Sequence, residues 1–371
     1  MQKQQVAFLS ALCWQGVEEG IYPGAAAMVA RKDKKKWHKT VASCGYTHAD
    51  GKGVQVDENT FFDLASLTKP LCTAMGFYYL AGAAALDLNS QVSTLPCCKN
   101  YPRLWQNIRL VDLLSHSSGL PAYRPYYQVF PPVQQAENKT KLLHLVQHEA
   151  LVYQTRGQCL YSDLGYMILG NILEEMSDLS LDVFFSRFLA DPCGLDADIG
   201  FRPIDQSKAD TSQIAATEQC PWRKRLLVGE VHDEHAWLMH GVAGHAGLFG
   251  KVEAVAALCI LLVDIWYGQA RHPNLDSTIV RQALSYKTKA GLWALGFDRP
   301  SPGQSSSGDY FSANSVGHLG YAGTSFWIDL EQKIVVVLLT NRVHPSRENK
   351  KIQQFRPYFH NRIMRELVGG E

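Results

Sequence analysis

Apolar residues recur along the chain with two different periods, which fall in different regions. Residues 3–19 have the three- and four-residue spacing of an amphipathic helix. After the chain break at Pro23-Gly24, small and apolar residues at 25–30 predict a strand, and residues 37–46 predict a second one. The helical period then returns in several segments: 67–78, 110–114, 142–152, 164–175, 181–189 and 254–266.

Strand character returns in the C-terminal part of the chain. Apolar runs at 292–297, 325–328 and 334–340 each predict a strand. The last two flank the polar link 329–333 and therefore predict a hairpin. A final helix is predicted at 350–368.

The order of these elements predicts an α+β fold with two lobes. The simplest arrangement is one antiparallel β-sheet formed by both chain ends and flanked by helices, with a mainly helical lobe inserted between them. We expect residues 1–83 and 251–371 to form the sheet lobe and residues 84–250 to form the helical lobe. A functional site would then lie between the lobes, where ligand sites are common.

Composition narrows the classes of function. The 371 residues include 36 basic and 35 acidic side chains, which gives a net charge of +1. This balance offers no electrostatic reason to expect nucleic acid or an anionic membrane as a partner.

Cysteine usage and the N-terminal segment bear on location. The nine cysteines are an odd number without Cys-x-x-Cys pairs, which is typical of reduced thiols in a cytoplasmic protein. The apolar stretch 6–14 is short, and no small-residue cleavage site follows it. We therefore expect a helix of the fold there and not a signal peptide, no transmembrane segment, and a cytoplasmic location.

Ser66 and Lys69 are the first candidates for chemistry. A serine hydroxyl becomes a good nucleophile when a base removes its proton, and a three-residue spacing places the lysine over the serine on one helical face. The N-terminus of a helix also offers backbone donors for an oxyanion. Ser-x-x-Lys alone is a weak motif, so the surrounding sequence must show whether Ser66 and Lys69 are catalytic.

The surrounding sequence resembles a known family. The segment 62–70, Phe-Asp-Leu-Ala-Ser-Leu-Thr-Lys-Pro, is similar to the nucleophile segment of the serine β-lactamase and penicillin-binding-protein superfamily, in its class C β-lactamase-like branch. The resemblance runs from about residue 20 to the C-terminus and implies the fold of that superfamily. It also implies a serine hydrolase that forms an acyl-enzyme at Ser66 with the help of Lys69 and without a cofactor.

The second motif of this family, Tyr-x-Asn, is matched by Tyr161-Ser162-Asp163. The resemblance implies that Tyr161 shares the role of base with Lys69. Asp163 departs from the family's asparagine, and a carboxylate near a lysine favours its ammonium form. We therefore hypothesise that Lys69 stays charged and orients Ser66 while Tyr161 takes the proton. The alternative for this segment is a helix N-cap formed by Asp163 behind a core tyrosine.

The third motif, Lys-Thr-Gly on an edge strand in the family, is represented by His318-x-Gly320 before the C-terminal hairpin. The Lys-Thr-Lys sequence at 287–289 lacks the glycine. Gly320 permits a close backbone approach, and the resemblance implies that the Tyr321 amide completes an oxyanion hole with the Ser66 amide. His318 would polarise the site or hold a substrate carboxylate less strongly than a lysine, because histidine is mostly neutral at about pH 7.

Two further segments extend the resemblance. Leu-Leu-Ser-His-Ser-Ser-Gly-Leu-Pro at 113–121 matches a signature that is common in this branch. Its serine and histidine suggest a second catalytic group, but a hydrogen-bonded turn is the better interpretation. The glycine-rich segment 241–249 resembles a loop found in one bacterial subgroup of these hydrolases.

A group of histidines offers a competing chemistry, that of a metal site. Catalytic zinc needs three protein ligands, but no His-Glu-x-x-His helix is present in the sequence. We expect no metal in the reaction, and weak accessory metal binding stays open. The group comprises His232, Asp233, His235, His240 and His245.

The expected function is hydrolysis of small esters, or of D-amino-acid and cell-wall-type peptides, through an acyl-serine. True β-lactamase or D-alanyl-D-alanine carboxypeptidase activity is the first alternative, and Asp163 and His318 make efficient β-lactam hydrolysis less favoured. A non-catalytic receptor of peptidoglycan fragments built on this fold is an alternative from another class. It is disfavoured because a binding protein has no need of a general base.

Overall fold

A five-stranded antiparallel sheet joins the two ends of the chain in the computed structural model, which describes residues 2–49, 53–202, 211–289 and 292–368. Its strand order is β2-β1-β10-β9-β8, and β1 pairs with β10 from Ala25–Thr340 to Arg31–Ile334. The sheet expected from both chain ends is therefore confirmed. The strands are β1 Gly24–Asp33, β2 Lys36–Gly45, β8 Val316–Leu319, β9 Ser325–Asp329 and β10 Ile334–Thr340.

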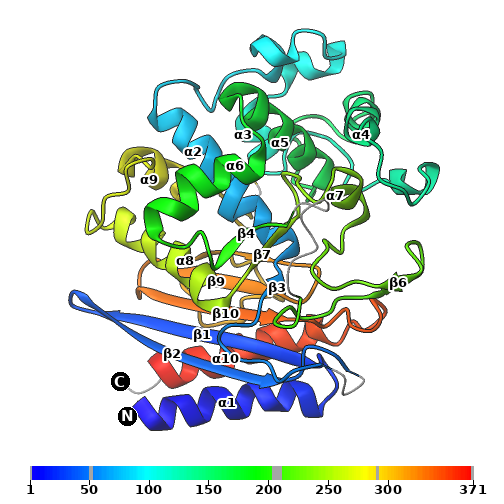
Figure 1. Ribbon diagram of the computed structural model, residues 1–371. Coiled ribbons are helices and arrows are strands. Elements are labelled where there is room, and N and C mark those ends of the chain that lie inside the picture. The colour runs from blue at the N-terminus through cyan, green and yellow to red at the C-terminus, as the bar shows by residue number, and fades with distance from the viewer. Residues whose placement is uncertain (1, 50–52, 203–210, 290–291, 369–371) are drawn as a thin grey trace.

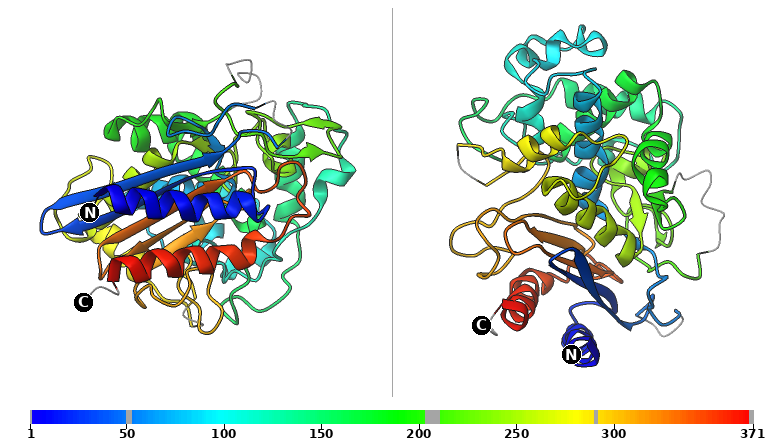
Figure 2. Two further views of the ribbon diagram at one scale, coloured as in Figure 1. Left: turned by 90° about the horizontal axis from the view of Figure 1, so that it is seen from below. Right: turned by 90° about the vertical axis from the view of Figure 1, so that its left-hand side faces the viewer.

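Helices cover both faces of this sheet. Helices α1 (Gln2–Glu18) and α10 (Ile352–Val368) lie side by side on the outer face (Figures 1 and 2). Helix α8 (Val252–Trp266) packs on the inner face against β1 and β10. Because both faces are covered, every residue of the central strand β10 is buried, which explains its uninterrupted apolar sequence.

The middle of the chain is mainly helical and lies beyond the inner face of the sheet (Figure 1). One hydrophobic core contains residues from both predicted lobes, and the lobe limits at 83 and 250 stay a prediction. The helices here are α3 Leu110–Leu114, α4 Asn138–Gln147, α5 Asp163–Ser177, α6 Leu181–Phe185, α7 Glu234–Leu238 and α9 Ser277–Ser285. The small sheets are β3-β7-β4 (Phe62–Asp63, Leu248–Gly250, Ile199–Phe201) and β5-β6 (Gln219–Cys220, Arg225–Leu226).

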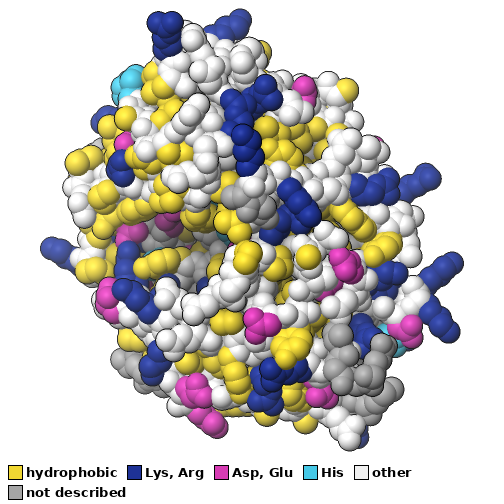
Figure 3. All heavy atoms as spheres, turned by 180° about the vertical axis from the view of Figure 1, so that it is seen from behind, with side chains coloured by type: hydrophobic (Ala, Val, Ile, Leu, Met, Phe, Trp, Pro, Cys, Tyr) yellow, Lys and Arg dark blue, Asp and Glu magenta, His cyan; other side chains and the backbone are white. Residues whose placement is uncertain are grey.

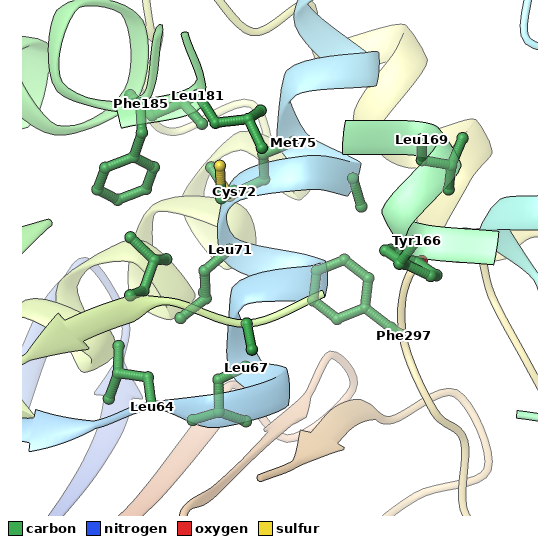
Figure 4. Close-up of a cluster of buried hydrophobic side chains, with 14 of the residues drawn as sticks. Leu64, Leu67, Leu71, Cys72, Met75, Tyr166, Leu169, Leu181, Phe185 and Phe297 are labelled. Atoms are coloured by element: carbon green, nitrogen blue, oxygen red, sulfur yellow. The ribbon is translucent and has the colours of Figure 1, made fainter. Parts of the chain in front are cut away.

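The segment that carries Ser66 runs through the centre of this core. It begins as a 3-10 turn at Ala65–Leu67, continues as a π-helical stretch at Lys69–Ala74 and becomes α2 at Met75–Gly82. Such π-helical stretches are frequent at functional sites. Figure 4 shows the apolar side chains around the segment, which come from α5, α6 and the chain after α9: Tyr166, Leu169, Leu181, Phe185 and Phe297.

Two glycines allow the loop 241–247 to pack directly on α5. A Cβ atom on Gly170 would lie 2.7 Å from the backbone nitrogen of Gly244, and a Cβ atom on Gly244 would lie 2.3 Å from the carbonyl oxygen of Tyr166. The same loop reaches the segment after Ser66, where the Thr73 hydroxyl donates to the Gly244 carbonyl at 2.7 Å. The two glycines thus bring together three parts of the chain that are far apart in sequence.

The strand predicted at 292–297 is not formed by these residues. They make a tight turn in which the Ala294 amide donates to the Phe297 carbonyl at 2.9 Å. Gly296 has a φ of 90°, and its amide donates to the Leu114 carbonyl at 2.9 Å. The run is apolar because the turn is buried in the core, so the prediction of a strand was wrong.

The surface agrees with the near balance of charges in the sequence. On the face shown in Figure 3, basic and acidic side chains are interspersed with hydrophobic and uncharged ones. Within the described ranges, no helix is both long enough and apolar enough to cross a membrane.

Gly170→Ala tests the contact between α5 and the loop 241–247. Alanine ordinarily favours a helix, but here its Cβ would meet backbone atoms, so we expect the free energy of unfolding to fall by about 1–3 kcal/mol. Gly200→Ala is the control, because no atom lies within 4 Å of a Cβ at that position. Urea denaturation measures the free energy of unfolding of both variants. Equal values for the two would contradict the close packing of α5 on the loop 241–247.

Candidate active site

Ser66 follows a strained turn that a buried carboxylate holds in place. Ala65 has a φ of 48°, which is uncommon for a residue with a Cβ. Its amide donates to Asp63 Oδ1 at 2.8 Å, and Asp63 Oδ2 accepts from the His232 amide at 2.7 Å. Burial raises the pKa of Asp63, and these two hydrogen bonds oppose the rise. Strained backbone of this kind is concentrated at functional sites, where the surroundings maintain it.

The amino group of Lys69 is fully buried and has three polar partners. Its Nζ lies 2.8 Å from Ser66 Oγ, 3.0 Å from the His245 carbonyl oxygen and 2.7 Å from Asp163 Oδ1. Burial lowers the pKa of Lys69, and the carboxylates of Asp163 and Asp233 oppose that effect. The structure therefore brings the first two motifs into direct contact.

This set of partners suits both protonation states of the lysine. A neutral amine can donate an N–H group to the His245 carbonyl while its lone pair faces the Ser66 hydroxyl. An ammonium group can donate to both of these oxygens, and the Asp163 carboxylate at 2.7 Å stabilises its charge as an ion pair. A proton can therefore pass between Ser66 and Lys69 without movement of either side chain.

The second motif stands at the start of α5. The Ser162 hydroxyl accepts from the Gly165 amide at 3.3 Å, so Ser162 is the N-cap and the alternative in which Asp163 caps the helix is wrong. Asp163 is the first helical residue, and its carboxylate is free to pair with Lys69. The ring centre of Tyr161 lies 4.9 Å from Lys69 Nζ.

Tyr161 is held as a neutral phenol. Burial and the Asp163 carboxylate raise its pKa well above the usual value, and a hydrogen bond with Ser66 only partly opposes this. The phenol is therefore a proton donor at neutral pH. Three rings surround it, with centroid distances of 4.6 Å to His116, 5.8 Å to Trp293 and 5.9 Å to His318.

The segment 113–121 is a hydrogen-bonded turn, as predicted, and it supports the second motif. His116 has a φ of 55°, and its Nδ1 accepts from the Ser162 amide at 3.1 Å. Its carbonyl accepts from the Leu160 amide at 2.9 Å. Burial lowers the pKa of His116 well below its usual value, so the ring stays neutral and keeps its acceptor nitrogen. This role was missed because no sequence signal links the two segments.

His318 lies in the edge strand β8 with its ring buried. Its Nδ1 lies 2.8 Å from the Leu319 carbonyl, which can only accept, so the ring proton is on Nδ1. Nε2 then presents a lone pair and has no partner within the described part of the chain. Burial and the nearby Lys69 lower the pKa of His318 to about 3. His318 is therefore a neutral hydrogen-bond acceptor and not a cation.

The turn after β8 packs against the residues that precede Ser66. The Thr324 hydroxyl donates to the Leu64 carbonyl at 3.1 Å. A Cβ on Gly320 would lie 2.8 Å from that carbonyl oxygen and 1.9 Å from the Thr324 hydroxyl, so the contact requires glycine. Tyr321 is the next residue and lies at the edge of the site.

Tyr321 is held from both sides, although half of its surface is exposed. Its ring stacks on His232 at a centroid distance of 5.7 Å, and the Arg342 guanidinium lies 4.5 Å from the ring centre. His232 pairs with Glu218 at 3.0 Å, and Glu218 in turn forms an ion pair with Arg347. A buried charged network thus supports the ring from behind.

Three members of the histidine group gather near Lys69. Ligand atoms of Asp233, His235 and His245 lie within 4.8 Å of one another, so these side chains could approach a single cation. Hydrogen bonds occupy Nε2 of both histidines, whereas Nδ1 of each ring is buried and has no partner among the described residues. Nε2 of His245 is paired with Asp233, and Nε2 of His235 accepts from the Tyr127 amide at 3.3 Å, which leaves the His235 proton on Nδ1.

The other two histidines of the group point elsewhere. His232 is paired with Glu218, and Nε2 of His240 lies 3.3 Å from the Gln135 carbonyl. Sequence spacing contains no signal that separates these two from the three that gather. Trp293 was missed for a similar reason, because it belongs to the run that was interpreted as a strand.

The fold is shared with penicillin-binding protein homologues of known structure. The model of the family described as Beta-lactamase matches residues 9–356. The chain belongs to the Beta-lactamase family, as the resemblance of its motifs implied.

Relatives and solved structures agree with this assignment. A protein of Salmonella gallinarum, provisionally named D-alanyl-D-alanine carboxypeptidase, is 32% identical over 324 residues, which cover 81% of this chain and 73% of the relative. The N-acetylmuramyl-L-alanine amidase of Bacillus subtilis is 32% identical over 354 residues, which cover 87% of this chain and 78% of the relative.

Two solved structures share the fold at low identity. The octameric penicillin-binding protein homologue from Pyrococcus abyssi has a TM-score of 0.73 and 17% identity, over 98% of this chain and 77% of that one. EstCE1, a hydrolase with promiscuous acyltransferase activity, has a TM-score of 0.70 and 19% identity, over 95% of this chain and 99% of that one.

Glu218→Gln tests the charged network behind Tyr321. Burial alone would raise the pKa of Glu218, but hydrogen bonds with His232 and Arg347 lower it from 4.5 to about 2. A carboxyl group with a lowered pKa in the folded state stabilises the protein above about pH 4.5, and this contribution is lost as pH falls from about 4.5 to about 2. The stability difference between wild type and variant should shrink over that range.

Urea denaturation at pH values above and within this range measures that difference. Glu348→Gln is the control, because Glu348 is an exposed neighbour of Arg347. A difference for Glu218→Gln that does not change with pH would contradict the network.

Proposed function

We propose that Ser66 is the nucleophile of an acyl-serine hydrolase and that Lys69 is the base that activates it. The observation that carries this proposal is the 2.8 Å contact between Lys69 Nζ and Ser66 Oγ, made by a fully buried amine whose other two partners are fixed oxygens. A base must lie within hydrogen-bond reach of the proton that it removes, and Lys69 does.

In the proposed acylation, neutral Lys69 takes the Ser66 proton while the serine oxygen attacks the substrate carbonyl carbon. Burial favours the neutral amine before the reaction, and Asp163 stabilises the ammonium that forms. The carbonyl oxygen becomes an oxyanion, for which the amides of Ser66 and Tyr321 are the proposed donors. The close packing of the turn at Gly320 supports this assignment.

Tyr161 is proposed as a proton carrier and not as the first base. Its raised pKa disfavours an ionised phenol, so Lys69 is favoured over the hypothesis in which a charged lysine only orients Ser66. The phenol can give its proton to the leaving group and regain one from the Lys69 ammonium. Water then attacks the acyl carbonyl carbon while Lys69 takes a proton from it. As the bond to Ser66 Oγ breaks, the Lys69 ammonium returns that proton to Ser66, which restores the hydroxyl group and the neutral amine.

The proposed substrates are small esters, or D-amino-acid and cell-wall-type peptides. Relatives named as a carboxypeptidase and an amidase support this range. Within it, His318 favours substrates without a carboxylate beside the scissile bond, because its neutral ring presents a lone pair where the family has a lysine. β-Lactams and D-alanyl-D-alanine peptides carry such a carboxylate, so β-lactamase and carboxypeptidase activity are second candidates.

We also propose a cytoplasmic location, with substrates as the partners of the site. The nine cysteines are free thiols, which supports a reducing compartment. The interspersed charges in Figure 3 give no support to a nucleic-acid or membrane partner.

Ser66→Ala is expected to abolish hydrolysis, because the acyl-enzyme cannot form. A panel of p-nitrophenyl esters and nitrocefin should show a fall in kcat/KM of about 10³-fold or more, and wild type should prefer the esters. Ser301→Ala is the matched control and should keep full activity, since Ser301 lies in a loop that belongs to none of the three motifs.

Full activity of Ser66→Ala on every hydrolysed substrate would overturn the central assignment. Stoichiometric labelling of wild type by a fluorophosphonate, without turnover of any ester, would favour the receptor alternative.

Asp163→Asn is expected to shift the pH profile of kcat/KM. The carboxylate raises the pKa of Lys69, so its removal makes the neutral amine available at lower pH. The rising limb should move to lower pH by about one unit or more. Asp198→Asn breaks a similar pair, with Lys251 at 2.7 Å, away from the site and serves as the control. An unchanged profile in Asp163→Asn would count against this role.

A further inference from the structure

His245 has two separate links to the site, one through its backbone and one through its side chain. Its carbonyl oxygen accepts from Lys69 Nζ at 3.0 Å. Its ring is 1% exposed, and Nε2 donates to Asp233 Oδ1 at 2.8 Å. The same Asp233 oxygen accepts from the Ala236 amide at 2.8 Å, as the N-cap of α7. A continuous series of contacts therefore runs from α7 through Asp233 and His245 to the lysine.

The backbone on either side of His245 is also anchored. The Thr73 hydroxyl donates to the Gly244 carbonyl at 2.7 Å, and the Leu248 amide donates to the Thr68 hydroxyl at 3.2 Å. These bonds determine where the loop lies against the segment that carries Lys69. They do not involve the His245 carbonyl. Among the hydrogen bonds of the described residues, His245 itself is held by the bond from Lys69 to its carbonyl and by the bond from its ring to Asp233.

The carboxylate charge of Asp233 also affects Lys69, in addition to the hydrogen bonds that link the two residues. Burial lowers the pKa of Lys69, and the carboxylates of Asp163 and Asp233 are the groups that raise it. Burial keeps four other titratable groups around the amine neutral: Tyr161, Tyr166, His116 and His318. Asp163 acts by direct contact, whereas the hydrogen bonds of Asp233 lead to Lys69 through His245.

We propose that Asp233 is a positioning residue for Lys69 and acts through the carbonyl of His245. The proposal rests on the proposed function, in which Lys69 is the base. The His245 carbonyl accepts an N–H group of the amine and Asp163 forms an ion pair with it, which leaves the lone pair of the neutral amine facing Ser66. If the His245 carbonyl turns away, one acceptor is lost and the lone pair is no longer held in line, and small misplacements of this kind cost about 10²-fold in rate.

The test compares Asp233→Ala with Asp233→Asn. Asp233→Ala removes both hydrogen bonds, and we expect fluorophosphonate labelling of Ser66 to slow by about 10²-fold, with a matching fall in kcat for an ester and little change in KM. Asp233→Asn keeps an oxygen that accepts from His245 and Ala236, so it should restore most of the rate. The rising limb of the pH profile of kcat/KM for Asp233→Asn should lie at lower pH than that of wild type, because the variant lacks the carboxylate charge that raises the pKa of Lys69.

Two further variants complete the design. His245→Ala breaks the ring contact but leaves the cap of α7 intact, and it should label as slowly as Asp233→Ala. His240→Ala is the control from the turn just before this loop, since its ring lies against the Gln135 carbonyl, and it should label at the wild-type rate. Thermal unfolding of each variant shows whether it is folded.

The proposal is overturned if folded Asp233→Ala or His245→Ala labels at the wild-type rate. It is also overturned if Asp233→Asn is as slow as Asp233→Ala, since charge alone would then account for the effect. Ser66→Ala separates the two proposals, because labelling of that variant would contradict the proposed function whatever the Asp233 variants do.

Discussion

The amino group of Lys69 is cut off from solvent, and this burial imposes a condition on three distant parts of the chain. A buried amine is costly unless each of its polar contacts is satisfied. Its partners are Ser66 before it, Asp163 at the start of α5 and the His245 carbonyl in the loop 241–247. The need to satisfy this one nitrogen accounts for the close contact of α5 with that loop. It also accounts for the strained turn before Ser66.

The same burial determines the charge of the whole site. It lowers the pKa of His116 and of His318 and raises the pKa of Tyr161, so all three are neutral. The charged groups that raise the pKa of Lys69 are the carboxylates of Asp163 and Asp233. These carboxylates and a neutral His318 support the proposed preference for esters or neutral amides over β-lactams.

Much of the fold could be predicted because its main signals are local. The apolar run of β10 lies within one strand and the Ser-x-x-Lys spacing lies within four consecutive residues, and both were recognised. The failures involve contacts between distant segments. The run 292–297 looked like a strand, but Gly296 bonds to Leu114, and no periodicity reports that contact. The pairing of His245 with Asp233, among four histidines close in sequence, is likewise set only when the loop meets α7.

The pairing of β1 with β10 has a consequence for the order in which the protein is completed. The two strands are separated by about three hundred residues, so β1 cannot pair with β10 until the residues between them have been made. Contacts of such long range make folding slow and leave one edge of β1 unpaired until β10 is available. The segment that leads into β10 also carries His318 and Tyr321. Closure of the sheet and completion of the site are therefore coupled events.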